Sequence, residues 1–266
     1  GVAGIADHFV FGFDAIGEVG QQARALRELA VEPDCLLQVG DRRVVAAQAK
    51  LDISGYELVD APHSVAAAEA AVQLVREGRA ELLMKGSLHT DELMGAVVKS
   101  ATGLRTSRRI SHCFIMDVPR LDRAIFVTDA AINIFPTMED KMHIIQNAID
   151  LAHSLGNEKP KVAILSAMET VNPKLQSTIE AGALCKMADR GQITGGILDG
   201  PLAFDNAISE AAARAKKIVS PVAGNADILV APDLQSGNMI AKQLQYLAGA
   251  DSAGIVLGTR VPIVLT

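Results

Sequence analysis

The sequence is short of positive charge, and this shortage excludes two kinds of partner. Its 266 residues include 25 Lys and Arg against 31 Asp and Glu, which gives a net charge of −6 and a pI near 5.5. Nucleic acids and anionic membranes attract proteins that carry a broad positive surface field. We therefore expect neither of them as a partner, and any anionic ligand must be bound by a few local groups.

Cysteine is also scarce, and long hydrophobic runs are missing. Cys35, Cys113 and Cys185 are odd in number, far apart and set in apolar runs. This pattern predicts buried, reduced thiols instead of disulfides, a zinc site or a nucleophile. No apolar run approaches the roughly 18 residues of a membrane span. Residues 1–20 contain acidic residues and lack the basic segment with which a signal peptide begins. These features predict a soluble, cytoplasmic protein.

Several catalytic signatures are absent as well. The sequence has no Walker phosphate loop, no GxGxxG after the first predicted strand and no GxSxG nucleophile turn. Its six histidines have none of the spacings typical of metal ligands. These absences disfavour nucleotide hydrolysis, conventional Rossmann dinucleotide binding, serine hydrolysis and a metal site.

Short apolar runs alternate with helical patterns along most of the chain. The predicted strands are residues 35–39, 56–59, 81–84, 112–116, 124–127, 161–165, 195–198, 226–230, 253–257 and 261–265. The predicted helices are residues 64–76, 91–100, 138–155, 173–190, 205–217 and 237–247. This alternation predicts an α/β fold with mainly parallel sheets and helices on both faces. At 49% hydrophobic residues, the chain can bury the core of one or two compact domains.

Polar residues follow the carboxyl ends of several predicted strands. Ligands of open parallel sheets bind at these ends, because loops and helix N-termini converge there. The candidate positions in these loops and in the helices that follow them are Lys85, Asp129, Asn133, Ser166, Asp199, Asp205, Asn206, Ser236, Gly237, Asn238 and Lys242. Several such loops together indicate a ligand site more strongly than any one of them alone.

The loop Ser236-Gly237-Asn238 has the clearest physical logic for binding an anion. At a helix start it offers free backbone N–H groups and the positive end of the helix dipole, and Lys242 adds a charge. An equally weighted alternative is that Ser236 or Asn238 only caps the helix, while Lys242 lies on its solvated face.

Two basic stretches have similar alternatives. Lys85 either binds phosphate or carries its amine from the core to water. The segment "TGLRTSRRI" at residues 102–110 is polar and basic, and a solvated loop is favoured there over a ligand-facing one.

Five sequence blocks resemble one enzyme family in order and spacing. They are "LLMKGSLHTDELMGAVV", "VTDAAINIFPTMEDK", "ILSAMETVNPK", "GGILDGPLAFDNAIS" and "ADILVAPDLQSGNMIAKQLQYLAGADSAGIVLGTRVPIVL". Over residues 36–266 the chain resembles the phosphate acetyl/butyryltransferases. The stretches "DGPLAFDNAIS" and "VNPK" are more similar to the butyryltransferase branch. Tyr246 stands where the acetyltransferase branch typically carries an Arg, which leaves apolar room for a longer acyl chain.

The resemblance implies an architecture and a set of partners. It implies two doubly wound α/β domains flanking a cleft, similar to isocitrate and isopropylmalate dehydrogenases, with residues 1–120 and 256–266 in the first domain and residues 121–255 in the second. The expected substrates are acyl-CoA and phosphate, and the expected assembly is a homodimer. Coenzyme A is a substrate, so no metal or redox cofactor is required.

The resemblance also implies a reaction and site residues. The coenzyme A thiol attacks the acyl phosphate carbonyl in a ternary complex, and phosphate leaves. The residues expected to shape or catalyse the reaction are Asp205, Asn206 and Ser166. The residues expected to contact phosphate or coenzyme A are Lys85, Asp199, Ser236, Gly237, Asn238, Lys242 and Arg260.

Both ends of the sequence depart from the family pattern. The family continues after the equivalent of "VPIVLT" with a Ser-Arg pair and a nearby Asp, and we expect a chain extended through these groups to be at least about a hundredfold faster than one ending at Thr266. Residues 1–31 do not resemble the family's opening strand and helix. This suits a remodelled start, an incomplete start, or the remnant of a fusion in the transferase part of a bifunctional enoyl-CoA hydratase and phosphate acyltransferase. Two alternative functions remain, a metal- and NAD-dependent dehydrogenase of similar fold and a non-catalytic coenzyme A-binding protein.

Overall fold

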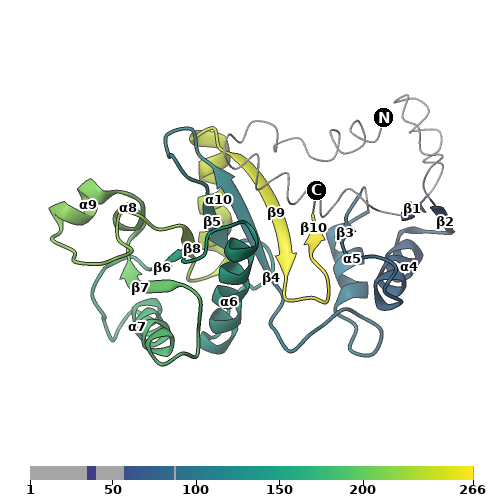
Figure 1. Cartoon of the computed structure of the whole chain (residues 1–266), viewed down its shortest axis with the longest axis horizontal. Coiled ribbons are helices and arrows are strands. Elements are labelled where there is room, and N and C mark those ends of the chain that lie inside the picture. The colour runs from purple at the N-terminus through teal and green to yellow at the C-terminus, as the bar shows by residue number, and fades with distance from the viewer. Residues whose placement is uncertain (1–34, 40–56, 87, 266) are drawn as a thin grey trace. The chain divides into compact units, whose positions relative to one another are not determined.

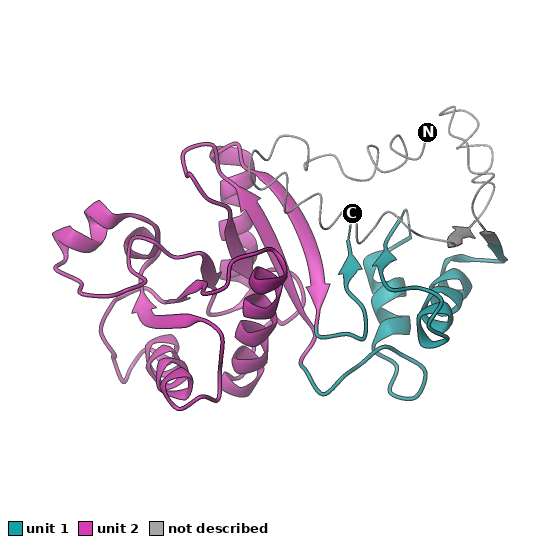
Figure 2. Ribbon diagram, viewed as in Figure 1, with its two compact units in different colours: residues 1–108, 258–266 teal, residues 109–257 magenta. Residues whose placement is uncertain are grey.

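The computed structural model describes residues 35–39, 57–86 and 88–265. The chain forms two compact units, coloured separately in Figure 2. Unit 1 comprises residues 1–108 and 258–266, and unit 2 comprises residues 109–257. The predicted α/β class is confirmed. The sequence predicted domain limits near residues 120 and 256, whereas residues 109–120 group with unit 2, because the strand they contain pairs with strands of that unit.

The described part of unit 1 contains two parallel strand pairs and two helices. Its described elements are β1 (Cys35–Val39), β2 (Glu57–Ala61), α4 (Ser64–Arg76), β3 (Leu83–Met84), α5 (Thr90–Val97) and β10 (Ile263–Val264). β1 pairs with β2, and β10 pairs with β3. α4 buries Ala68, Val72 and Val75 on one face, the 3.6-residue periodicity that predicted it. Its observed ends are those expected from the sequence.

The strands of unit 2 form one mixed sheet. They are β4 (Ser111–Asp117), β5 (Ile125–Thr128), β6 (Lys161–Leu165), β7 (Ile197–Leu202), β8 (Ile228–Val230) and β9 (Asp251–Leu257). Their order across the sheet is β9-β4-β5-β8-β6-β7. β5, β8, β6 and β7 are parallel, whereas β4 is antiparallel to both β5 and β9. Because Cys113 pairs with Thr128, β4 begins at the edge where β5 and its parallel neighbours end.

Different helices cover the two faces of this sheet (Figure 1). α6 (Met138–Ser154) and α7 (Gln176–Asp189) lie on one face, and α10 (Leu234–Leu247) lies on the other. Ile240 and Leu244 of α10 pack against the core cluster that contains Ile125 and Val127 of β5. The sheet is therefore buried on both faces, as the apolar runs predicted.

The helix predicted at residues 205–217 is wrong in its continuity. The structure has two short helices there, α8 (Phe204–Ile208) and α9 (Glu210–Ala215). Ser209 separates them, and its side chain accepts a hydrogen bond from the backbone N–H of Ala212, at 3.3 Å. A serine that caps a new helix stabilises a break in a segment that has helical spacing on both sides.

The predicted end of the strand at Leu198 is also wrong. β7 continues through Asp199-Gly200-Pro201 to Leu202. A Cβ on Gly200 would lie 2.8 Å from the Cβ and carbonyl oxygen of Ile164 in β6, so glycine permits the two strands to approach closely. β7 is the last strand of the sheet order, a position where proline is tolerated. Gly-Pro therefore marks an edge strand here and not its end.

Among the described residues, no helix is both long and apolar enough to cross a membrane. Two described cysteines, Cys113 and Cys185, are free thiols. Burial raises the pKa of the Cys113 thiol far above its usual range, and burial raises the pKa of the Cys185 thiol to about 12. Cys35 lies in β1, where the structure describes the backbone only.

Candidate active site in unit 2

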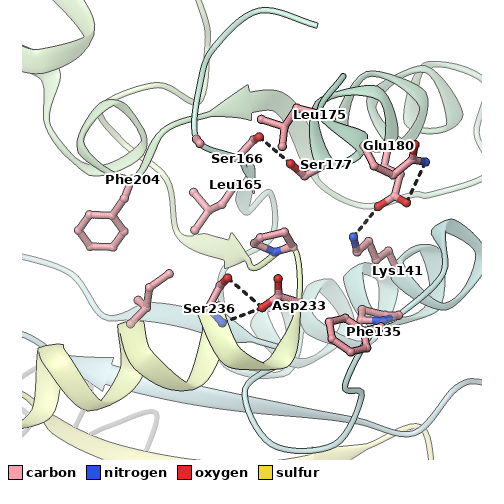
Figure 3. Close-up of a pocket in the computed structure, with 15 residues that line it drawn as sticks. Phe135, Lys141, Leu165, Ser166, Leu175, Ser177, Glu180, Phe204, Asp233 and Ser236 are labelled. Atoms are coloured by element: carbon pink, nitrogen blue, oxygen red, sulfur yellow. Dashed lines mark hydrogen bonds and ion pairs between the residues drawn. The ribbon is translucent and has the colours of Figure 1, made fainter. Parts of the chain in front are cut away.

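A cavity of about 560 Å³ lies in unit 2 where β6 and β8 end (Figure 3). Leu165 and Ser166 reach it from the end of β6, and Pro232, Asp233 and Ser236 reach it from the loop after β8 and the start of α10. The other lining residues are Phe135, Pro136, Lys141, Ala167, Leu175, Gln176, Ser177, Glu180, Phe204 and Ile240. Its volume falls in the range of about 300 to 1,000 Å³ of small-molecule sites, and it lies at the sheet edge where the sequence predicted a ligand.

An ion pair between α6 and α7 lies in the cavity wall (Figure 3). Lys141 is only 4% exposed, and its Nζ lies 2.5 Å from Oε2 of Glu180. Oε1 of Glu180 also accepts a hydrogen bond from Nε2 of Gln176, at 3.2 Å. The carboxylate of Glu180 balances the ammonium charge of Lys141. A buried lysine is stable as a cation only beside such a counterion. This lysine is therefore committed to Glu180.

Hydroxyl groups supply the remaining polar contacts of the wall. The Oγ atoms of Ser166 and Ser177 are hydrogen-bonded at 2.8 Å. Oδ1 of Asp233 accepts from the backbone N–H of Ser236 at 2.8 Å and from its Oγ at 2.9 Å. Leu165, Phe204 and other apolar side chains form the rest of the surface, so the cavity is mostly apolar with a few hydrogen-bonding groups.

The helix start predicted at Ser236-Gly237-Asn238 is wrong by three residues. α10 begins at Leu234, and Asp233 is its N-cap. The N–H of Ser236 donates to Oδ1 of Asp233, and the N–H of Gly237 donates to the Asp233 carbonyl, at 3.1 Å. The free N–H groups expected at Ser236 and Gly237 are thus already bonded within the helix, and the capping carboxylate occupies the place of an anion.

Gly237 and Asn238 contact the chain after β5. A Cβ on Gly237 would lie 2.3 Å from the carbonyl oxygen of Asp129, so packing requires glycine there. Nδ2 of Asn238 donates to the carbonyl of Ala130, at 3.1 Å. Both residues therefore fix α10 against the end of β5.

Lys242 and Tyr246 lie together on the outer face of α10. Nζ of Lys242 is 5.8 Å from the centroid of the Tyr246 ring, and Tyr246 is 76% exposed. Neither lines the cavity, and the role of Tyr246 in making room for a longer acyl chain stays a prediction.

Asp199, Asp205 and Asn206 do not line the cavity. Oδ1 of Asp199 accepts from the N–H of Gly200, at 2.8 Å. Asp205 is exposed, with Oδ2 3.8 Å from Nζ of Lys216. Asn206 is fully buried and donates from Nδ2 to Glu169. Its Oδ1 has no hydrogen-bond partner among the described residues.

Lys85 and Arg260 belong to unit 1. Lys85 is 8% exposed, and its Nζ donates to the carbonyls of Gly86 and Leu88 at 3.0 and 3.3 Å. Its amine therefore bonds to the loop that follows β3. Arg260 is exposed, and its backbone N–H donates to the carbonyl of Leu104, at 2.9 Å. Of the predicted site residues, only Ser166 and Ser236 line the cavity of unit 2.

Comparison with known proteins agrees with this fold and these blocks. Residues 42–266 match the model of the phosphate acetyl/butaryl transferase family. The chain is 67% identical over 224 residues to a phosphate acetyltransferase of Rhizobium meliloti, covering 84% of this chain and 71% of that protein. The chain belongs to this family.

Further relatives in the family carry both acyl names. The chain is 57% identical to a phosphate acetyltransferase of Rickettsia prowazekii, over 86% of this chain and 66% of that protein. It is 41% identical to a phosphate butyryltransferase of Clostridium acetobutylicum, over 84% of this chain and 74% of that protein. A branched-chain phosphotransacylase structure from Enterococcus faecalis superimposes with a TM-score of 0.73 at 36% identity, over 79% of this chain and 75% of that one. The chain thus spans about two thirds to three quarters of these relatives.

The family member described here also has site groups that the sequence analysis did not single out. Lys141, Ser177 and Glu180 lie inside predicted helices, and only the packing of α6 on α7 brings them to one cavity. The signal that points to Lys141 is its place in the block "VTDAAINIFPTMEDK". Glu180 has no comparable signal, because an acidic residue on a helix is ordinarily solvated.

A second polar network surrounds Asp129 at the end of β5. Asp129 and Asn133 are 3% and 2% exposed. Oδ1 of Asp129 accepts from the N–H groups of Ala131 and Ile132, at 2.9 and 3.0 Å, and Oδ2 accepts from Nδ2 of Asn133, at 2.5 Å. Oδ1 of Asn133 accepts from Nε of Arg109, at 2.7 Å. These contacts satisfy the hydrogen-bonding groups of a buried carboxylate and a buried amide. They lie at the edge of the sheet where β5, β6 and β8 end, which we call the ligand edge.

Proposed function

We propose that this protein transfers a short acyl group, acetyl or butyryl, between coenzyme A and inorganic phosphate. The observation that carries the proposal is the family match over residues 42–266, and the cavity at the carboxyl edge of a parallel sheet supports it. The same match favours a transferase over the dehydrogenase and the non-catalytic binding protein.

The cavity suits an uncharged and flexible part of the substrates. Lys141 is balanced by Glu180, and Asp233 is engaged in capping α10. A phosphate group would find no uncommitted cation among the lining residues. Apolar side chains such as Phe204 and Ile240 and the hydroxyl of Ser166 instead fit the pantetheine arm or the acyl chain, which need apolar contact and a few hydrogen bonds.

The reaction forms a bond between the thiol sulfur and the acyl carbon and breaks the bond from that carbon to the phosphate oxygen. The thiol proton passes to a base, and the oxyanion of the tetrahedral intermediate accepts hydrogen bonds. We assign such hydrogen-bond donation to Ser166, and we keep Asp205 and Asn206 as groups that shape the site. Contacts to phosphate or coenzyme A from Lys85, Lys242 and Arg260 belong to the same proposal.

Direct transfer in a ternary complex is favoured over a covalent acyl-enzyme. A cysteine nucleophile must be a thiolate, whereas the pKa values of Cys113 and Cys185 are raised by burial. The reaction as proposed uses no cofactor besides coenzyme A, which is a substrate. We also propose a cytoplasmic homodimer, on the basis of the composition and of the family resemblance.

An acyl-chain series tests the proposal. The natural polypeptide that contains this sequence is mixed with coenzyme A and with acetyl, propionyl, butyryl or isobutyryl phosphate, and loss of the free thiol is followed. We expect thiol loss that depends on enzyme and that needs no added NAD. Thiol loss with none of the four acyl phosphates would refute acyl transfer, and reduction of NAD with a hydroxy acid would support the dehydrogenase alternative.

A further inference from the structure

Arg109 lies at the ligand edge of the unit 2 sheet, although the sequence placed it in a solvated loop. It precedes β4, which begins at Ser111. Because β4 is antiparallel to β5, the beginning of β4 lies beside Thr128, the last residue of β5. Arg109 therefore lies at the same edge of the sheet as Ser166 and Asp233, which follow the ends of β6 and β8.

The side chain of Arg109 is held at one nitrogen. Its Nε donates to Oδ1 of Asn133, at 2.7 Å, and lies 3.4 Å from Oδ1 of Asp140. The side chain is 52% exposed. The terminal nitrogens Nη1 and Nη2 have no hydrogen-bond or ion-pair partner within the described part of the chain. The inner side of the guanidinium is therefore fixed, while its outer fork remains open.

The side chain that holds Arg109, Asn133, is itself held by hydrogen bonds. Nδ2 of Asn133 donates to Oδ2 of Asp129, at 2.5 Å, and to the carbonyl of Ile110, at 2.8 Å. The backbone N–H of Asn133 donates to the same carboxylate, at 3.2 Å. Because both amide protons are committed, the orientation of the amide is fixed, and its oxygen faces Arg109. An arginine that is oriented in this way loses less rotamer entropy when it binds a ligand.

Asp140 does not use up the arginine. Its Oδ2 accepts from the N–H and Oγ1 of Thr137, at 3.0 and 2.9 Å, in the capping box of α6. Only Oδ1 faces Arg109, and it lies on the Nε side at ion-pair distance. A partly shared carboxylate at 3.4 Å leaves the two terminal nitrogens available for a planar, bidentate contact with an anion.

We infer that Arg109 binds a phosphate group of the substrates through its terminal guanidinium nitrogens, with Asn133 as its positioning residue. The inference rests on the proposed function, which supplies the phosphate as coenzyme A or as inorganic phosphate. Arg109 is not itself a lining residue of the cavity, but its terminal nitrogens are open, whereas Lys141 in the cavity wall is committed to Glu180.

Binding measurements test this inference without relying on turnover. Isothermal titration calorimetry uses coenzyme A, 3′-dephospho-coenzyme A and inorganic phosphate as probes. The proteins are the wild type, Arg109→Gln, Arg109→Lys and the matched control Arg214→Gln. Arg214 is also an exposed arginine, paired with Glu210 at 2.9 Å, but it lies on α9 and is not bonded to a buried amide.

We expect Arg109→Gln to weaken binding of at least one probe by about tenfold or more, because a charge-assisted bidentate contact is lost. Arg109→Lys should recover only part of the affinity, since it restores the charge without the fork. A loss for coenzyme A alone identifies the 3′-phosphate, an equal loss for its dephospho form identifies the diphosphate, and a loss for inorganic phosphate identifies the transferred group.

The role of Asn133 is tested by a double-mutant cycle. Asn133→Ser should weaken binding of the same probe in the wild type and should add little in the Arg109→Gln background, because its effect passes through the arginine. If Asn133 has a purely structural role, the affinity losses of the two single variants should instead add in the double variant. Thermal unfolding should then also show that the Asn133→Ser variants are less stable.

Three results would overturn the inference. They are dissociation constants of Arg109→Gln and Arg109→Lys within twofold of wild type for every probe, an equal loss in Arg214→Gln, or no binding of any probe by folded wild type. Turnover is measured separately. Probe binding that depends on Arg109 without any acyl transfer would refute the proposed function and leave the phosphate contact standing.

Discussion

Replacing Glu180 with Gln should destabilise unit 2, because it leaves the buried ammonium of Lys141 without its counterion. The side chains of Lys141 and Glu180 are 5% and 15% exposed, and the charged atoms are 2.5 Å apart. Removing one partner of a buried pair costs about 3 to 5 kcal/mol. Water can reach this pair through the cavity, so we expect the lower end, about 3 kcal/mol. Gln keeps the shape and one hydrogen-bond acceptor, which isolates the effect of charge.

The double variant Lys141→Met/Glu180→Leu is the matched control. Removing both charges removes the desolvation penalty together with the attraction, so its stability should lie within about 1 kcal/mol of wild type. Urea unfolding at pH 7, followed by far-UV circular dichroism, gives the free energies of all three proteins. If Glu180→Gln unfolds at the same urea concentration as wild type, or if the double variant is as unstable as the single one, the pair is not a buried ion pair of the kind described.

Three further predictions concern Gly237, His112 and the two described cysteines. Gly237→Ala should lower the stability of the protein by at least about 2 kcal/mol in urea unfolding, because the added Cβ would lie 2.3 Å from the Asp129 carbonyl; a neutral effect would contradict the tight contact of α10. Burial lowers the pKa of His112 to about 4 from its usual 6.5, so between these pH values the unfolded chain binds a proton that the folded chain does not. The free energy of unfolding should therefore fall by about 3 kcal/mol between pH 6.5 and pH 4. His112→Leu should abolish this part of the pH dependence in urea titrations, and an unchanged slope would refute the prediction. Cys113 and Cys185 should resist alkylation at pH 8 in the folded protein and react after unfolding, as peptide mass spectrometry would detect; rapid labelling of the native thiols would show that they are accessible.

The sequence predicts the elements of this fold well where a single local signal decides them. α4 and β6 have the predicted ends, because the periodic apolar face of one and the apolar run of the other are bounded by polar residues. β7 was predicted too short, since Gly200 and Pro201 are ordinarily signs of a turn and only the neighbouring β6 explains them as an edge strand.

The site is less predictable, because tertiary contacts decide it. Ser166 and Ser236 were found from their positions near strand ends, and both line the cavity. The partner of Lys141 lies on another helix, and no sequence spacing connects the two. Arg109 was overlooked for a topological reason: residues before a strand lie at the ligand edge only when that strand is antiparallel, and the direction of β4 is not encoded in its residues.

The most direct test of acyl transfer uses inorganic phosphate labelled with 18O, together with butyryl-CoA or acetyl-CoA and the natural polypeptide that contains this sequence. Mass spectrometry follows the products. We predict one acyl phosphate for each coenzyme A released, with an oxygen of the labelled phosphate bridging the acyl carbon and the phosphorus. Release of coenzyme A with free carboxylic acid and no labelled acyl phosphate would contradict phosphate acyl transfer and would indicate a thioesterase.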